Sequence, residues 1–296
     1  MTNSAQDAIL VQTPPSQRKW ANCAPFFGFA ALILVSYAVV LEKLAQQWLS
    51  DPDMTHGIFV PFLVAYIVWE KRDALWSIQP THNLVGILLM LVGAFFLCIG
   101  PPGLDTYAAV TRVAFVLTAL GAILWLRGSA TVRMLLYPLA ILLLMFPMPG
   151  FVLEKLTFPL QMIASNLAEH ILELMRYSVL REGNILILPG QTLNIAEACS
   201  GLRSMMALTF LGQAYIYLFD SRAWMRLAIA ILVVPIAVFA NALRIVTSAV
   251  AGSYNREWGE GTYHESTGWI VFVVAFVCVL AAHAILKSIV RRIPGK

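Results

Sequence analysis

Apolar runs long enough to cross a lipid bilayer recur along the whole chain, and they constrain its fold more than any other feature. A helix needs roughly 20 apolar residues to span the hydrocarbon core. Charged residues make up only 12% of this chain, against roughly 25% in soluble domains, so they are too few to cover a soluble surface. We therefore predict an all-α polytopic membrane protein, because a helix satisfies its own backbone hydrogen bonds in lipid.

Eight of these runs predict about eight transmembrane helices, the second of them short and interrupted by Pro61. The predicted spans are 24–41, 57–70, 84–100, 107–126, 132–147, 201–219, 226–250 and 267–287. We expect one transmembrane domain over 24–290, with polar tails over 1–23 and 291–296. No convincing signal-peptide cleavage site follows the first apolar run, so we expect that span to be retained.

Lysine and arginine predict the orientation. With the N-terminus inside, the inner segments carry 12 of these residues and the outer segments carry 8. Basic residues favour the cytoplasmic side, and short loops count most. We therefore predict a multi-pass protein of the cytoplasmic (inner) membrane, with both termini and both tails inside. The net charge of +4 is explained by these flanks, so nucleic-acid binding is not expected.

The segment 148–200 breaks the spanning pattern. Residues 153–176 place leucine and isoleucine at helical spacing among several charged residues, which predicts an amphipathic helix at the membrane interface. Residues 183–190 form a short apolar stretch between turn-forming residues, which predicts an extended, hairpin-like arm.

Three short motifs carry the polar chemistry of the chain. They are Glu197-Ala198-Cys199-Ser200-Gly201, Asn241-Ala242-Leu243-Arg244 and His264-Glu265-Ser266-Thr267-Gly268. Arg244 follows Arg226 by 18 residues, which is about 27 Å along a helix. The predicted spans therefore place all three motifs at the outer face.

Cys199 is the candidate nucleophile because it precedes the start of a predicted helix. The partial positive charge of a helix N-terminus favours a thiolate. Free backbone N–H groups at that turn are able to bind an oxyanion, and Gly201 allows close backbone approach. The other cysteines, Cys23, Cys98 and Cys278, lie in apolar segments and are expected to be small hydrophobes. Their scattered positions predict neither a disulfide framework nor a metal site, and we expect no cofactor.

Arg244 and His264 supply the other two functions that acyl transfer needs. An arginine inside a predicted span is a functional candidate by default; the alternative is that it only reaches the headgroups. Asn241 lies on the same helix face, three residues earlier. Imidazole is the natural proton shuttle for a thiol, and His56 is a competitor for this role on the same face. His82 is predicted to be cytoplasmic, while His170 and His283 are predicted to be structural.

Together the motifs resemble those of the exosortase/archaeosortase family of membrane cysteine transpeptidases, most strongly over about 147–268. Trp48, Asp51, His56, Pro61 and Trp69 also resemble that family's outer-loop region, less specifically. The resemblance implies that Cys199 is the nucleophile, that Arg244 stabilises the transition state and that His264 transfers the proton. Glu197, Ser200, Gly201 and Asn241 would support them.

The resemblance also implies the substrates and partners. These would be membrane-anchored secreted proteins with a C-terminal sorting signal of the PEP-CTERM type: a short motif, often Pro-Glu-Pro, then a transmembrane helix and a basic tail. The enzyme would form a thioester outside the membrane and transfer the new C-terminus to an unknown acceptor, such as a lipid or glycan. Two alternatives remain open from the residues alone. One is a small-solute transporter or channel, and the other is a lipid- or polysaccharide-assembly protein that binds phosphate through Arg244 and His264.

Overall fold

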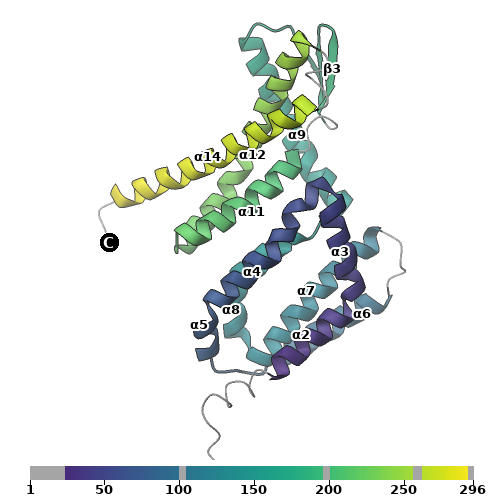
Figure 1. The fold of residues 1–296 in the computed structure, drawn as a ribbon, viewed down its shortest axis with the longest axis vertical. Coiled ribbons are helices and arrows are strands. Elements are labelled where there is room, and N and C mark those ends of the chain that lie inside the picture. The colour runs from purple at the N-terminus through teal and green to yellow at the C-terminus, as the bar shows by residue number, and fades with distance from the viewer. Residues whose placement is uncertain (1–23, 100–104, 196–200, 256–261, 293–296) are drawn as a thin grey trace, which may run out of the picture. The chain divides into compact units, whose positions relative to one another are not determined.

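The computed structural model describes residues 24–99, 105–195, 201–255 and 262–292, and these are almost entirely helical (Figure 1). Two compact units divide the chain. One comprises 1–44 and 72–136, and the other comprises 45–71 and 137–296.

The first unit is built around two apolar helices, α6 and α7, which pack antiparallel to each other. Its described elements are α2 (Ala24–Ser36), the start of α3 (Ala38–Ser50), α5 (Arg72–Ser77), α6 (Leu84–Ile99), α7 (Asp105–Arg127) and the start of α8 (Ser129–Leu142). The backbones of α6 and α7 approach closely at glycine, because a Cβ atom on Gly86 would lie 2.6 Å from the Gly121 carbonyl oxygen. Small residues at such crossings are typical of membrane helices.

The second unit holds all three motifs. After the end of α3 it contains η1 (Pro52–Ile58), α4 (Phe59–Glu70), the end of α8, η2 (Leu143–Met145) and α9 (Gly150–Leu174). Three strands follow, β1 (Leu180–Glu182), β2 (Ile185–Leu188) and β3 (Gln191–Asn194). The chain then continues through α11 (Gly201–Phe219), α12 (Ala223–Tyr254) and α14 (Thr262–Arg292).

A helix occupies each of the eight predicted spans, but fewer than eight satisfy the requirements for crossing a bilayer. In the described part, three are long and apolar enough: Ala108–Arg127, Ala223–Tyr254 and Thr267–Arg291. A fourth candidate is the bent pair Gly28–Ser36 and Ala38–Ser50. The shorter apolar helices are Leu84–Ile99, Ser129–Met145 and Met205–Phe219. The multi-pass helical class is therefore confirmed, while the full count of eight stays a prediction.

The first predicted span, 24–41, is not one straight helix. It is broken at Tyr37, and the two helices meet at an angle of 68°. The Tyr37 side chain is buried; its hydroxyl lies 2.8 Å from that of Thr118 on α7, and its ring packs edge-on against Phe115. The break therefore coincides with the contact of the Tyr37 side chain with α7. Hydropathy alone does not predict such a contact.

The hairpin predicted at 183–190 is confirmed, and it belongs to a larger antiparallel sheet of order β1-β2-β3. Gly183 and Gly190 make the two turns with φ of 66° and 86°, a conformation open to glycine without steric cost. Leu186 and Leu188 of β2 are buried in a cluster shared with α9 and α12. The sheet therefore packs on the helices that carry or neighbour the motifs (Figure 1).

The helix predicted over 153–176 is confirmed as α9. Small side chains face the protein, since Ala164, Ser165 and Ala168 are fully buried, and α9 packs closely on α12. Leu156, Ile163 and Leu174 of the predicted apolar stripe are exposed on the protein surface. That exposure is compatible with the predicted contact of this stripe with lipid.

Candidate functional site

The predicted site residues differ in what the structure describes of them. Glu197, Cys199 and Ser200 lie outside the described residues, and Gly201 is the first residue of α11. Asn241 and Arg244 lie in α12. His264 lies in the first turn of α14, where its backbone but not its side chain is described.

The Arg244 guanidinium lies against the backbone of Gly268. A Cβ atom on Gly268 would be 3.3 Å from both Cζ and Nη2 of Arg244 and 3.5 Å from Nε. The Nε atom is buried. Gly268 ends the third motif and Arg244 ends the second, so the fold brings these two motifs into contact. A small cavity between α11, α12 and α14 is lined by both residues together with Asn241.

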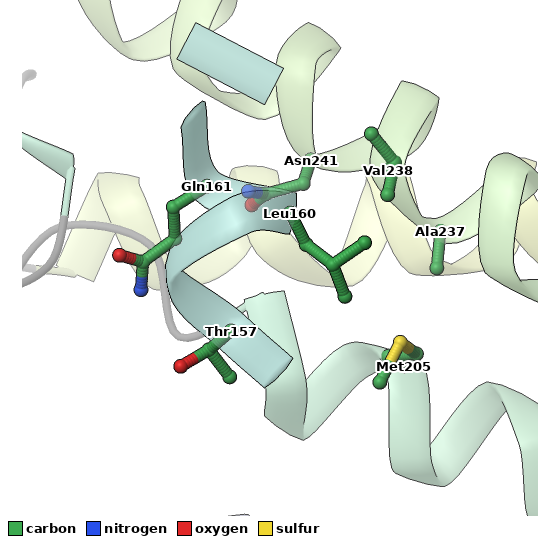
Figure 2. A pocket seen from close by; sticks show the side chains of 7 residues that line it. All are labelled: Thr157, Leu160, Gln161, Met205, Ala237, Val238 and Asn241. Atoms are coloured by element: carbon green, nitrogen blue, oxygen red, sulfur yellow. The ribbon is translucent and has the colours of Figure 1, made fainter. Parts of the chain in front are cut away.

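Asn241 also faces a second cavity, between α9, α11 and α12. Figure 2 shows its side chain directed toward Leu160 and Gln161 of α9. Met205 of α11 and Ala237 of α12 line the other end. The cavity measures about 20 Å³, room for roughly one water molecule. The cavity is therefore too small to hold a peptide.

Described residues on both sides of 196–200 lie against α12. Before it, Ile195 is fully buried in a cluster with Ala242 and Ile245. After it, Met205 shares the cavity with Asn241. β3, which leads into this segment, is fixed to the same helix because the Gln191 side-chain amide donates a 2.6 Å hydrogen bond to the Ala249 carbonyl.

His56, the competing proton shuttle, is engaged in packing. It is buried, and its Nε2 lies 3.1 Å from the Leu144 carbonyl oxygen. Burial lowers the pKa of this imidazole, although the backbone carbonyls of Leu144 and Asp53 oppose the shift. A neutral ring that donates to a buried carbonyl is a sufficient structural role for His56, because it satisfies a buried acceptor.

Two of the three cysteines predicted to be small hydrophobes are described, and they are free thiols. Cys98 on α6 and Cys278 on α14 are both exposed on the protein surface. Both lie in apolar helical segments, whose outward faces suit lipid. Cys23 lies outside the described residues.

The sequence did not predict a buried ionic network formed by Asp220, Arg222 and His283. His283 was predicted to be structural, but its partner Asp220, in the loop after α11, was not singled out. The Asp220 carboxylate accepts hydrogen bonds from Arg222 Nε (2.9 Å) and Nη2 (2.5 Å) and lies 3.2 Å from His283 Nε2. The other ring nitrogen of His283 lies 2.9 Å from the Tyr215 hydroxyl. The available signal was an acidic residue at the end of an apolar helix, which needs a partner when it is buried.

Helical architecture and apolar helices long enough to span a bilayer define a multi-pass membrane protein, in which two of the polar motifs meet. The model of the transmembrane exosortase family matches residues 48–281, and the chain belongs to that family. Its members are cysteine-dependent membrane peptidases and transpeptidases that act on proteins with sorting signals. Neither curated proteins nor solved structures gave a match.

Proposed function

We propose that this chain is a membrane cysteine transpeptidase that cleaves the C-terminal sorting signal of secreted proteins at the outer interface. Cys199 is the nucleophile, Arg244 stabilises the oxyanion and His264 transfers the proton. The observation that carries the proposal is the contact of the Arg244 guanidinium with Gly268, which joins two of the three motifs.

Helix geometry supports the place of His264 in this arrangement. Positions 264 and 268 are four residues apart in α14, and residues at this spacing share one helix face. Gly268 on that face contacts Arg244. His264 is therefore about one helical turn, about 6 Å, from the guanidinium contact along the helix axis.

Chain length supports the place of Cys199. It follows the buried Ile195 by four residues and precedes Gly201 by two. Four residues span at most about 14 Å when fully extended. Ile195 before Cys199 and Met205 after it both lie against the part of α12 that carries Asn241 and Arg244. The chain is therefore long enough for the Cys199 thiol to reach this site.

The reaction assigns one step to each group. The Cys199 thiolate attacks the scissile carbonyl carbon, and the resulting oxyanion accepts hydrogen bonds from the Arg244 guanidinium. The C–N bond then breaks, and the leaving amine takes a proton from His264. The signal helix departs and a thioester remains. An amine, hydroxyl or water attacks that thioester and transfers its proton to His264; the C–S bond breaks, and the Cys199 thiolate and the protonated His264 are restored.

Co-expression of the chain with a tagged, signal-bearing substrate tests the proposal. We expect Cys199→Ala to abolish processing while the protein still inserts into the membrane. The matched control replaces Cys23, Cys98 and Cys278 together by Ala and should process substrate normally. Unchanged processing by Cys199→Ala, or loss of processing in an inserted triple variant, would contradict the assignment.

Mass spectrometry of the processed substrate identifies the group that attacks the thioester. An added mass at the new C-terminus would reveal the acceptor, a lipid or a glycan. A free carboxylate would instead assign hydrolysis as the resolving step.

A further inference from the structure

A second polar site lies at the other end of α12 from Arg244. Arg226 is in the first turn of this helix, and its guanidinium lies over two tyrosine rings. Its Cζ atom is 4.6 Å from the ring centroid of Tyr137 on α8 and 4.7 Å from that of Tyr217 on α11. The two rings are stacked on each other, with centroids 5.6 Å apart.

Hydrogen bonds fix this aromatic platform in place. The Tyr137 hydroxyl donates to the Gln213 carbonyl (2.9 Å), and the Tyr217 hydroxyl donates to the Glu70 carboxylate of α4 (2.6 Å). The Gln213 amide donates in turn to the backbone carbonyl of Arg226 (3.3 Å). Four helices thus hold one guanidinium in a defined orientation.

The charge of Arg226 is not neutralised by an ion pair within the described residues. Within the described residues the guanidinium makes one hydrogen bond, and it is long, 3.4 Å from Nη2 to the Asp220 backbone carbonyl; the buried Nε has no partner. Arg222, one turn away, instead forms an ion pair with the Asp220 carboxylate. The Arg226 guanidinium therefore keeps N–H donors that no acceptor among the described residues satisfies.

A second cation adjoins Arg226. Lys71, at the end of α4, is half-buried, and its pKa is lowered by burial and by the positive charge of Arg226. Glu70 supplies a negative charge that acts on Lys71, and its carboxylate already accepts a hydrogen bond from the Tyr217 hydroxyl. The region keeps a net positive charge and opens to the surface, since Arg226 is half-buried and Glu70 is exposed.

We propose that Arg226 and Lys71, on the platform of Tyr137 and Tyr217, form a binding site for a phosphate group. The planar guanidinium group of arginine binds phosphate through N–H donors of fixed direction, and it also stacks on aromatic rings. Basic pockets between membrane helices bind anionic lipid headgroups. The phosphate is that of an anionic lipid or a free ion, and it would offset the repulsion between the two cations. This site is independent of the transpeptidase proposal.

Binding to the purified full-length chain in neutral detergent tests the site in two arms. Native mass spectrometry compares retention of phosphatidylglycerol with that of phosphatidylcholine, and equilibrium dialysis measures binding of radiolabelled inorganic phosphate. A preference for phosphatidylglycerol assigns a lipid source, whereas phosphate binding alone assigns the free ion. In whichever arm binding occurs, Arg226→Gln should weaken it at least about tenfold, because a charge-assisted contact is lost.

Arg133→Gln is the matched control. It removes the same charge from an exposed residue of α8 outside the site, and it should leave binding unchanged. If Arg226→Gln fails to fold, Lys71→Gln, at the end of a helix, should weaken binding by about fivefold. The proposal is overturned by absence of binding in both arms, by wild-type binding of a folded variant of the site, or by an equal loss in Arg133→Gln.

Discussion

At the scale of single residues, the Arg244 guanidinium occupies space that a side chain at Gly268 would take. A methyl group there would lie 3.3 Å from two atoms of the Arg244 guanidinium, closer than ordinary van der Waals contact. The guanidinium would have to move by a few tenths of an ångström. Catalytic groups tolerate little displacement, because small misplacements already slow the chemical step.

Gly268→Ala should therefore slow processing without destabilising the protein. We expect a loss of about tenfold or more, while helix propensity at this position improves by up to about 1 kcal/mol. Processing of a tagged substrate and thermal unfolding in detergent measure the two effects. Gly212→Ala is the matched control, because its Cβ atom would meet Val233 and Val279 at ordinary distances of 3.4 Å and 3.6 Å. Equal processing by both variants would show that Gly268 does not position Arg244.

Arg244→Lys separates oxyanion binding from anchoring. Lysine reaches the headgroups as well as arginine does, but it lacks the planar fork of directed donors. Loss of an oxyanion donor costs on the order of 10²–10³ in rate. We expect the variant to insert normally and to process substrate at least about tenfold more slowly, which is roughly 1.4 kcal/mol in the barrier. Near-normal processing would return Arg244 to the anchoring role.

At the scale of elements, Asp220 ties the loop between α11 and α12 to α14. Hydrogen bonds from Arg222 hold the pKa of this carboxyl well below its ordinary value of 3.8, although burial opposes the shift. A carboxyl with a lowered folded-state pKa stabilises the fold above its unfolded-state pKa and loses that contribution as pH falls. The contribution is thus complete at neutral pH and declines below about pH 4.

Asp220→Asn should lower the free energy of unfolding by about 1–3 kcal/mol at pH 7, because buried donors lose a charged acceptor. Thermal unfolding in detergent at pH 7, 5 and 3 measures this difference, and we expect it to shrink at pH 3. The exposed pair of Arg72 and Asp73, 3.7 Å apart, supplies the control. Asp73→Asn should change stability little, as expected of a surface ion pair. A difference between wild type and Asp220→Asn that is as large at pH 3 as at pH 7 would contradict the assignment.

Sequence periodicity predicted the positions of helices and turns better than the contacts between them. The α9 helix and the turn glycines around β2 follow from local propensity, which the sequence carries directly. β3 was missed because Gln191–Asn194 is polar and short, and its place is fixed by pairing with β2 and by the Gln191 bond to α12. The break at Tyr37 likewise depends on a hydroxyl contact with a distant helix.

The same distinction applies to the site. Motif spacing and helix length predicted that Arg244 and the third motif lie at one end of the bundle, and the contact of Arg244 with Gly268 agrees with this. The roles of Gly268 and Asp220 depend on which atoms meet across helices. Such contacts arise from tertiary packing, so no local sequence pattern predicts them.

At the scale of the whole molecule, one helix separates the two polar regions of the second unit. α12 has 32 residues, about 48 Å at 1.5 Å per residue, and this exceeds the roughly 30 Å hydrocarbon core. The Asp220 loop lies before its first residue, while the sheet contacts its last two turns through Ala249. If α12 spans the bilayer, these regions lie on opposite sides of it.

The positive-inside rule predicts which side is which, and single-cysteine labelling tests the prediction. Glu182 on β1 and Ser221 in the loop before α12 are both exposed. Each is changed to Cys in a variant that lacks the native cysteines, and a membrane-impermeant maleimide is applied to cells. We expect Glu182→Cys to react in intact cells and Ser221→Cys only after permeabilisation. The reverse pattern would place the sheet, Arg244 and Gly268 on the cytoplasmic side, where a secreted substrate no longer presents its sorting motif, and the proposed reaction would lose its site of action.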